Sequence, residues 1–564
     1  MTAGRTPSRV RSAAAFFLVF FPAVYLVSLG SGALIEPDEA RYGEIPREMI
    51  ESGDFLTPRL NYVKYFEKPP LYYWLTGASL ALLGRNEYAV RLPTAVMALA
   101  GIALTGLLAR RFFGPRAGLL AAVVLGSAGG YLAMGQLAVI DMTLTFFLST
   151  GTALLMLAAL GEERGWDRGA ALFLGLAVLA KGPVALVLPA VVVTGYFLLT
   201  RDRGLFRRVV SAPAALIFAA VTVPWFLLVS LRNPEFPAFF FYHEHLQRFF
   251  ASSARKAFHA EPFWFFFPVL LALIFPWLTC IPAAVREVLR GGSPETRKPL
   301  AFLTAWWAGI LIFFSISSSK LIPYVLPCLP PLAVWVGWGI DRILDRGTGK
   351  PGSAELRFAA ALLALIGLGL GGYRLFAPEP LLSPAACFLP AAAALLGGAA
   401  VWVAGRRPSL FSFCLLGAVS AAVVSSSLAL IRSSLEDFRS TKALAMKALS
   451  LRRNREPFYS FNFYAQGFPF YTGERLVLVD SLGELRFGAY RGSEENRRWF
   501  IPGTRLRRKM AGAEEVFVVF EEEDEDSMQW ISRGDMEIAA RTGGYLLARN
   551  RRSPGSSEEE VKPE

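Results

Sequence analysis

About thirteen apolar segments, separated by polar connections, constrain the fold of this chain more than any other feature. They lie near residues 12–34, 88–109, 117–133, 137–159, 169–180, 183–200, 209–231, 263–285, 300–317, 321–340, 358–376, 383–404 and 409–431. Most have close to the ~20 residues that a helix needs to cross the hydrocarbon core of a bilayer. Soluble domains do not sustain a hydrophobic content of 54% over 564 residues. The chain is therefore predicted to be an all-α polytopic membrane protein.

Two of these segments allow more than one interpretation. The first, 12–34, follows a short basic stretch and imitates a signal peptide, but its length and the spans after it favour a retained helix. Within 169–200, Lys181-Gly182-Pro183 divides one long apolar run. This run is interpreted either as two short spans or as a re-entrant hairpin.

The net charge of +13 does not indicate a nucleic-acid-binding protein, because the positive residues are spread among the apolar segments. Short Lys/Arg clusters recur on alternate connections, at 110–116, 201–208, 286–298, 341–357 and 405–408. Basic connections stay on the cytoplasmic side of a membrane. We therefore expect a cytoplasmic N-terminus, a first loop that lies outside and a C-terminus that also lies outside. The excess positive charge suits anionic phospholipid or phosphorylated glycolipid as well.

The composition changes after the last apolar segment. Residues 1–432 are expected to form the transmembrane domain, with external loops at 34–87 and 232–262. Residues 440–453 have a helical pattern, and alternating apolar residues predict strands at 458–463, 475–479 and 516–520. A small soluble α/β domain on the outer side is therefore predicted over 433–552, and a disordered acidic tail over 553–564.

The first external loop, 34–87, is too long and too rich in charges and aromatic rings to be a simple connection. Two parts of it are expected to be short helices at the membrane surface: residues 45–50 and the stretch after Pro69-Pro70. Its candidate site residues are Asp38, Glu39, Arg41, Tyr42, Tyr65, Glu67 and Lys68. Carboxylates, cations and aromatic rings at a membrane surface suit a polar head group attached to a lipid.

Further polar residues stand at the external ends of later segments under this topology. They are Asp141, Lys181, Lys320 and Tyr324, together with His243, Glu244 and Arg248 in the 232–262 loop. Ionisable side chains at membrane depth usually mark a functional site. One face of the membrane is therefore expected to collect residues that are far apart in the sequence.

Simpler roles compete with a functional one for several of these residues. Asp141 is placed to cap the helix that follows it. Lys181 and Lys320 are placed to act as interfacial anchors.

A metal site is a weaker alternative. His243 and His245 suggest zinc, with His259 as a third ligand, but they lack the spacing of an HExxH motif. The four cysteines lie in apolar segments without metal-ligand spacing. No metal or other cofactor is expected, with a divalent ion kept as an open alternative.

Five stretches carry a family resemblance. They are residues 37–74, AVIDMTLTFF, LAKGPVALVLPA, FYHEHLQRF and SSSKLIPYVLPCLPPLAV. On these stretches, in order and spacing as far as about residue 340, the chain resembles the lipid A aminoarabinose transferase (ArnT) family, within the protein O-mannosyltransferase-like group of GT-C glycosyltransferases. The resemblance implies a GT-C fold in the bacterial inner membrane, with the active site and the C-terminal domain in the periplasm. It also implies a polyprenyl-phosphate-linked sugar as donor, and lipid A or its precursor as acceptor. It is weaker through 358–431 and in the external domain.

The resemblance also implies roles for the candidate residues. Asp38 and Asp141 match the essential carboxylates of the family, and Lys68, with Arg41 beside it, matches contacts to the donor phosphate. The predicted catalytic residues are Asp38, Asp141 and Glu39. The predicted donor-phosphate contacts are Lys68, Arg41, Tyr324 and Lys320. The residues assigned to substrate binding are Tyr42, Tyr65, Glu67, Lys181, His243, Glu244 and Arg248.

The residue types suit transfer of a sugar between phosphates. The donor is a phosphodiester, and its polyprenyl phosphate departs as a phosphate monoester. A lipid A phosphate is already ionised at neutral pH, since its second pKa is about 6. Cations bring the two anions together. Carboxylates stabilise positive charge that develops at the anomeric carbon, or hold an amino group on the sugar. The resemblance implies inversion at that carbon.

Two other functions remain as alternatives. A related GT-C enzyme would use another polyprenyl-phosphate sugar or a protein serine or threonine, and a hydroxyl acceptor needs an aspartate as general base. A glycolipid flippase or transporter is more remote, because the spans show no inverted repeat and the charges gather on one face rather than at the midplane. The residues themselves identify neither the sugar, which the resemblance gives as 4-amino-4-deoxy-L-arabinose, nor the phosphate that is modified.

Overall fold

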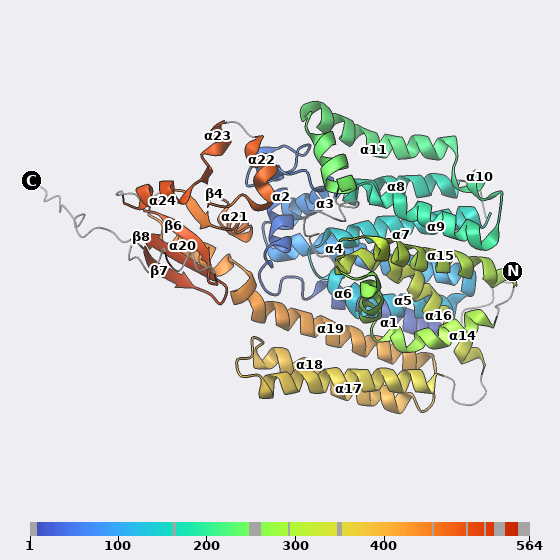
Figure 1. Cartoon of the computed structure of the whole chain (residues 1–564). Helices are drawn as coiled ribbons and strands as arrows, with labels where there is room; N and C mark the ends of the chain where they lie inside the picture. The colour runs from blue at the N-terminus through green and yellow to red at the C-terminus, as the bar shows by residue number, and fades with distance from the viewer. Residues whose placement is uncertain are drawn as a thin grey trace, which may run out of the picture. The chain divides into compact units, whose positions relative to one another are not determined.

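The structure is a computed structural model, and it divides the chain into two compact units (Figure 1). It describes residues 8–161, 165–247, 261–290, 294–346, 352–453, 456–491, 494–511, 515–523, 529 and 536–550. Unit 1 consists of Met1–Ser31, Glu67–Ser79 and Tyr88–Ile431. Unit 2 consists of Gly32–Phe66, Leu80–Glu87 and Arg432–Glu564.

Unit 1 is helical, and three of its helices, α3, α4 and α19, each have one end in unit 2. The helices in chain order are α1 (Ser8–Leu26), α3 (Leu71–Leu83), α4 (Glu87–Phe113), α5 (Pro115–Ser127), α6 (Gly129–Gly135), α7 (Ile140–Ala159), α8 (Trp166–Lys181), α9 (Val184–Thr200), α10 (Leu205–Val209), α11 (Ala212–Arg232), η1 (Ala238–Gln247), η2 (Phe263–Phe265), α13 (Phe266–Leu273), η3 (Trp277–Cys280), α14 (Ile281–Leu289), α15 (Pro294–Ile316), η4 (Ile322–Cys328), α16 (Leu329–Asp345), α17 (Ser353–Phe376), α18 (Pro384–Ala404) and α19 (Leu410–Arg439).

Each predicted transmembrane segment corresponds to a helix or to a pair of consecutive helices. In the described part of the chain, nine helices are long and apolar enough to cross a membrane, and two bent pairs raise the number to eleven. The remaining two segments are α8 and α9, with 16 and 17 residues. The run 169–200 is therefore two helices, which end and begin on either side of Gly182-Pro183. The prediction of a polytopic helical membrane protein is confirmed.

The helices of unit 1 differ in how much of their surface is buried. In the most apolar 18-residue stretch of α7, 89% of the residues are buried, whereas in those of α1 and α11 only 22% are. Helix α7 therefore lies in the interior of the unit. Helices in lipid pack closely where small residues face each other. A Cβ atom on Gly367 of α17 would lie 2.8 Å from the carbonyl oxygen of Ala391, and one on Gly398 of α18 would lie 3.1 Å from that of Ala360. These glycines explain why α17 and α18 run beside each other (Figure 1).

One buried cation within unit 1 was not predicted. Arg91 of α4 donates hydrogen bonds to the carbonyl oxygens of Leu29 and Ser31 at 2.8 and 3.0 Å. A buried guanidinium needs such partners, since desolvation of an unpaired charge costs several kcal/mol. Arg91 therefore ties the chain after α1 to α4.

Unit 2 combines part of the first loop with the C-terminal domain. Its helices are α2 (Asp38–Ser52), α20 (Lys442–Leu451), α21 (Gly467–Thr472), η5 (Gly483–Leu485), α22 (Arg486–Tyr490), α23 (Glu494–Arg497) and α24 (Gly503–Met510). Its strands are β1 (Arg59–Leu60), β2 (Val63–Lys64), β3 (Phe458–Phe461), β4 (Leu476–Val479), β5 (Phe500–Ile501), β6 (Phe517–Glu521), β7 (Met536–Arg541) and β8 (Tyr545–Asn550).

Six of the strands form one mixed sheet, in the order β5-β4-β3-β6-β8-β7. Strands β5, β4, β3 and β6 are parallel, and β8 and β7 add to them in antiparallel pairing. The prediction of a small α/β domain is confirmed, and the three predicted strands correspond to β3, β4 and β6. These are continuous apolar runs, typical of parallel strands covered on both faces. Strands β5, β7 and β8 were not predicted; β5 has only two residues and β7 has a mixed pattern.

Helix α2 differs from its prediction. It begins at Asp38 rather than near residue 45, and ten of its residues are buried, including Glu44, Arg47 and Glu48. The prediction of a short surface helix over 45–50 is wrong because these charges pair with one another inside the unit instead of forming a solvated face. The other predicted surface helix, after Pro70, corresponds to α3.

A two-residue turn fastens the first loop to the sheet of unit 2. Asn61 and Tyr62 join β1 to β2 with φ angles of 52° and 60°, as a tight hairpin requires. The Asn61 side chain donates to the carbonyl oxygen of Leu476 at 3.0 Å and accepts from its N–H at 3.1 Å. Sequence analysis placed the whole of 34–87 with the transmembrane domain. The structure instead groups Gly32–Phe66 with the C-terminal domain, through pairings that join residues about 400 positions apart.

Candidate active site

The ends of α7 and α8 bring three predicted site residues together in unit 1. Asp141 lies in the first turn of α7, Lys181 lies in the last turn of α8, and the two side chains form an ion pair. Each charge has the sign that its helix end favours. The Lys181 ammonium also lies 5.0 Å from the ring centre of Tyr324, on η4. Asp141 forms no capping hydrogen bond, because Val139 is the N-cap residue of α7. The ion pair therefore replaces the interpretation of Asp141 as a helix cap and that of Lys181 as an interfacial anchor.

A second group in unit 1 surrounds Lys68. Its ammonium donates to a carboxylate oxygen of Glu244 at 3.2 Å and to the carbonyl oxygen of Glu67 at 3.0 Å. Glu244 lies on the π-helix η1, next to His243, whose ring centre is 5.3 Å from that of Tyr242. The structure thus pairs two residues that the sequence separates by 176 positions. A lysine has three N–H bonds, so one donor of Lys68 remains for a ligand.

Lys320 lies between α15 and η4 and is buried. Its ammonium donates to the carbonyl oxygens of Glu261, at 2.9 Å, and Ser317. Burial lowers the pKa of Lys320 below its usual value. These contacts brace the turn before η4, and contact with a donor phosphate stays a prediction.

Three residues of the 232–262 loop lie partly or wholly outside the described part of the chain. Arg248 and His259 fall in the gap between 247 and 261, and only the backbone of His245 is described. In the described ranges, no group of three or more His, Cys, Asp or Glu side chains is placed to hold a metal ion. Metal-independent chemistry therefore stays a prediction.

The first turn of α2 carries the candidate residues of unit 2. Arg41 lies 3.4 Å from Asp38, 3.3 Å from Glu484 and 3.2 Å from Gln466. The Asp38 side chain is 67% exposed, so a substrate can reach it. Tyr65 donates to Glu484 at 3.2 Å. The C-terminal domain thus supplies the partners that hold Arg41.

Two further predicted residues of α2 face inward. Tyr42 is buried, with its ring centre 6.0 Å from the Arg41 guanidinium carbon. Glu39 is also buried and accepts a hydrogen bond from the backbone N–H of Ile35 at 3.1 Å. This contact makes Glu39 a structural residue, because it ties the start of α2 to the chain that precedes the helix. A catalytic role for Glu39 stays a prediction.

Glu36 is a residue that sequence analysis missed. Its buried carboxylate accepts hydrogen bonds from the Thr441 hydroxyl at 2.8 Å and from the backbone N–H groups of Gln466 and Gly467 at 3.1 and 2.7 Å. Burial raises the pKa of Glu36 to about 7, against these hydrogen bonds and Arg41, which lower it. No local pattern marks Glu36, because all its partners lie about 400 or more positions away.

This carboxyl group is expected to make the stability of unit 2 depend on pH. From about pH 4.5, its unperturbed pKa, to about pH 7, the folded state retains a proton that the unfolded chain has released. The free energy of unfolding is therefore expected to fall across this window, by about 3 kcal/mol in total. The midpoint temperature of thermal unfolding, measured on the whole protein in detergent, should fall less steeply with pH in Glu36→Gln than in the wild type. The control is Glu537→Gln, whose carboxylate is 43% exposed and pairs with Arg549. It should keep the wild-type slope, and identical slopes in all three proteins would contradict the assignment.

Comparison with known proteins finds one matching family and several relatives of this chain. Residues 67–227 match the family described as dolichyl-phosphate-mannose-protein mannosyltransferase. An undecaprenyl phosphate-alpha-4-amino-4-deoxy-L-arabinose arabinosyl transferase from Pseudomonas fluorescens is 34% identical over 338 residues, which are 59% of this chain and 58% of the relative. A protein of the same name from Pseudomonas aeruginosa PAO1 is 34% identical over 64% of this chain and 65% of its own. The chain thus matches somewhat less than two thirds of the length of these relatives.

A solved structure matches over nearly the whole chain. ArnT from Cupriavidus metallidurans, in a crystal structure with undecaprenyl phosphate, gives a TM-score of 0.84 at 29% identity, with 96% of this chain and 98% of that chain covered. The chain is thus similar to ArnT over nearly its whole fold. As an ArnT-like protein it is a multi-pass membrane protein, in agreement with its helices. The mannosyltransferase match, which starts at Glu67, includes Lys68, Asp141 and Lys181.

Proposed function

We propose that this ArnT-like protein is an integral-membrane glycosyltransferase. It transfers 4-amino-4-deoxy-L-arabinose from a polyprenyl-phosphate donor to a phosphate of lipid A, at the periplasmic face of the bacterial inner membrane. The observation that carries this proposal is the likeness, over 96% of the chain, to an ArnT structure that holds undecaprenyl phosphate.

The transfer forms one bond and breaks another at the anomeric carbon of the sugar. An oxygen of the acceptor phosphate bonds to that carbon, and the bond from the carbon to the donor phosphate oxygen breaks, with expected inversion. The polyprenyl phosphate leaves with the electron pair. The protein has to place two anions near one carbon and to stabilise the charge that moves between them.

The two lysines of unit 1 have the chemistry that this task needs. Lys68 keeps one N–H bond beyond its contacts with Glu67 and Glu244, and an ammonium is a compact donor for a phosphate oxygen. Lys181 is held between Asp141 and the ring of Tyr324. We assign Lys68 to the donor phosphate and Lys181 to the positioning of Asp141.

The carboxylates act on the sugar in this proposal. Asp38 is exposed and Asp141 is half of an ion pair, and both carry charge that stabilises a developing positive centre. The sugar's amino group is a second target for them. Since an ionised phosphate has no proton to lose, neither carboxylate has to act as a general base.

One observation favours a second candidate function. The match over 67–227 is to protein mannosyltransferases, whose described acceptor is protein. With a serine or threonine hydroxyl as acceptor, Asp38 would become the general base.

The experiment that separates these functions measures initial transfer rates with three acceptors. The purified protein receives a polyprenyl-phosphate sugar together with phosphorylated lipid A, dephosphorylated lipid A or a serine-containing peptide, between about pH 5 and 9. Transfer is expected only with phosphorylated lipid A, with a pH profile that follows ionisation of the acceptor phosphate near pH 6. Transfer to the peptide, without transfer to lipid A, would replace the proposal with the second function.

A further inference from the structure

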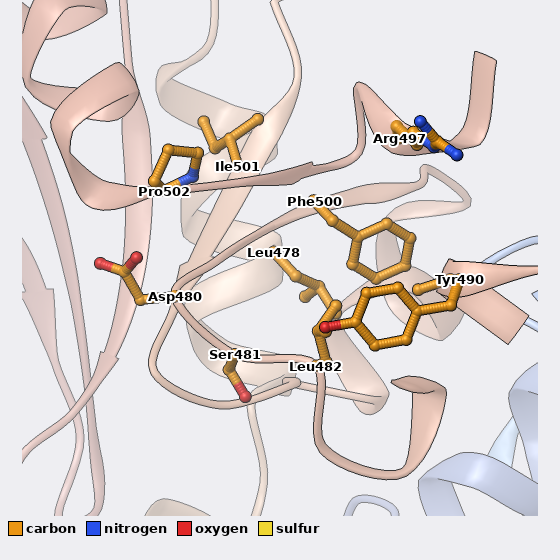
Figure 2. A pocket seen from close by; sticks show the side chains of 10 residues that line it. Leu478, Asp480, Ser481, Leu482, Tyr490, Arg497, Phe500, Ile501 and Pro502 are labelled. Atoms are coloured by element: carbon orange, nitrogen blue, oxygen red, sulfur yellow. The ribbon is translucent and has the colours of Figure 1, made fainter. Parts of the chain in front are cut away.

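A cavity of about 640 Å³ lies at one edge of the six-stranded sheet in unit 2 (Figure 2). Strand β5 is outermost, and it pairs in parallel with β4. The residues that follow these strands, Asp480 and Ser481 after β4 and Pro502 after β5, line the cavity. In open α/β sheets, ligands bind beyond the carboxyl ends of parallel strands. The cavity therefore has the position of a ligand site, and no residue of it has a role in the proposed transfer.

Aromatic rings form part of the cavity wall. The lining includes Tyr490 and Phe500, with the buried side chain of Leu478. The ring of Tyr490 is 69% exposed, although burial of such a ring is normally favourable. An exposed ring at a cavity offers an apolar face and a polar tip to a ligand. Such a face suits the C–H surface of a pyranose ring.

A carboxylate lies at one side of the lining. Both carboxylate oxygens of Asp480 are 3.0 Å from the backbone N–H of Gly503, the first residue of α24. The Asp480 carboxylate therefore already compensates the partial positive charge at the N-terminus of α24. The remaining lone pairs of Asp480, which is exposed, accept from hydroxyl or ammonium groups of a ligand. A second anion has to bind elsewhere in the cavity.

An arginine lies on the opposite side of the lining. Figure 2 shows Asp480 and Arg497 far apart, with the rings of Tyr490 and Phe500 toward Arg497. Arg497 is exposed and forms no ion pair with a side chain that the structure describes. A guanidinium is suited to a phosphate, which it binds through two parallel hydrogen bonds.

The charge around the cavity has the same sign as Arg497. Residues 486–509 include eight basic residues and two acidic ones. On α24 the buried residues are Gly503, Leu506 and Met510, which leaves Arg505 and Arg508 exposed. A concentration of one charge beside a cavity attracts ligands of the opposite charge.

We infer that this cavity binds a phosphorylated saccharide, the head group of the acceptor. This inference rests on the proposed function, in which the acceptor is a phosphorylated glycolipid. The phosphate binds to Arg497, a sugar ring lies against Tyr490, and hydroxyl groups donate to Asp480. The C-terminal domain is thereby an acceptor-binding domain.

Binding to the whole purified protein in detergent tests this inference. The probe is a deacylated, phosphorylated glucosamine disaccharide, compared with its dephosphorylated form and with inorganic phosphate. Calorimetry is expected to show that Arg497→Glu and Tyr490→Ala each raise the Kd of the phosphorylated probe about tenfold. Arg497→Lys should bind with intermediate affinity, because it keeps the charge and loses the paired hydrogen bonds.

The matched control is Arg541→Glu, since Arg541 is an exposed arginine of β7, at the other edge of the same sheet. It should bind the probe as the wild type does. Wild-type affinity in Arg497→Glu and Tyr490→Ala would overturn the inference, as would inorganic phosphate binding as tightly as the disaccharide. In transfer assays, Arg497→Glu and Tyr490→Ala should raise the KM for lipid A and leave kcat within about twofold of the wild-type value. If probe binding depends on Arg497 but the wild-type protein transfers no sugar, the proposed function is rejected and the binding site in this cavity stands.

Discussion

Replacement of Lys68 by alanine is expected to lower the rate of sugar transfer by about 10²–10³-fold, the usual effect of removing one preorganised charge from a transition state. The ammonium already lies 3.0–3.2 Å from the Glu67 carbonyl and the Glu244 carboxylate, so it is held in place before a phosphate arrives. Lys68→Arg should be partly active, because a guanidinium keeps the charge but not the compact geometry. Glu244→Gln should lose less, about tenfold, since its amide oxygen still accepts from Lys68.

The matched control for Lys68 is Lys442, another lysine paired with a glutamate, at 2.7 Å from Glu87. Lys442→Ala should transfer sugar at the wild-type rate. All four variants are compared in initial rates with saturating lipid A, after gel filtration has shown that they are folded. A folded Lys68→Ala protein with full activity would remove Lys68 from the mechanism.

The largest loss of stability is expected from Arg47→Ala, about 3–5 kcal/mol in the free energy of unfolding of unit 2. Arg47 donates two hydrogen bonds of 2.7 Å to Glu44, and it also pairs with Glu51. Glu44 and Glu48 are buried almost completely, and burial raises the pKa of both. Without Arg47, these carboxyl groups remain buried with no cation paired to Glu44, which is why the loss is large.

Denaturant unfolding of the whole protein, followed through the sheet signal of unit 2, measures this loss. Glu44→Gln in the Arg47→Ala background should recover part of the stability, because it removes the unpaired charge. The control is Arg59→Ala in the same loop, whose partner Asp54 is 3.4 Å away and whose side chain is 27% exposed. The Asp54 side chain is 11% exposed and keeps hydrogen bonds from the backbone N–H groups of Leu56 and Thr57 when Arg59 is removed. The loss in Arg59→Ala is therefore expected to be smaller, about 1 kcal/mol. Equal losses in Arg47→Ala and Arg59→Ala would show that the buried pair of Arg47 and Glu44 contributes no more to the free energy of unfolding than the pair of Arg59 and Asp54.

Local sequence was enough to predict the helices of unit 1 and the central strands of unit 2. Whether a segment crosses a membrane depends on its own transfer free energy, which its length and composition determine. Strands β3, β4 and β6 were predictable for a similar reason, since a continuous apolar run has few other stable environments. The sequence also singled out candidate site residues, because charges beside apolar spans are rare. Their roles stay predictions.

The tertiary structure alone decided which of these residues meet. The partner of Lys68 is 176 positions away, that of Asp141 is 40 positions away, and that of Glu36 is 405 positions away. No local propensity depends on residues so distant. The same holds for α2, whose charges have the pattern of a solvated surface and are instead buried against one another. The sequence by itself thus determined the membrane-crossing helices, the strands β3, β4 and β6, and a set of candidate residues. The pairing of buried charges depended on the packing of the whole chain, because the free energy of a charge depends on what surrounds it in space.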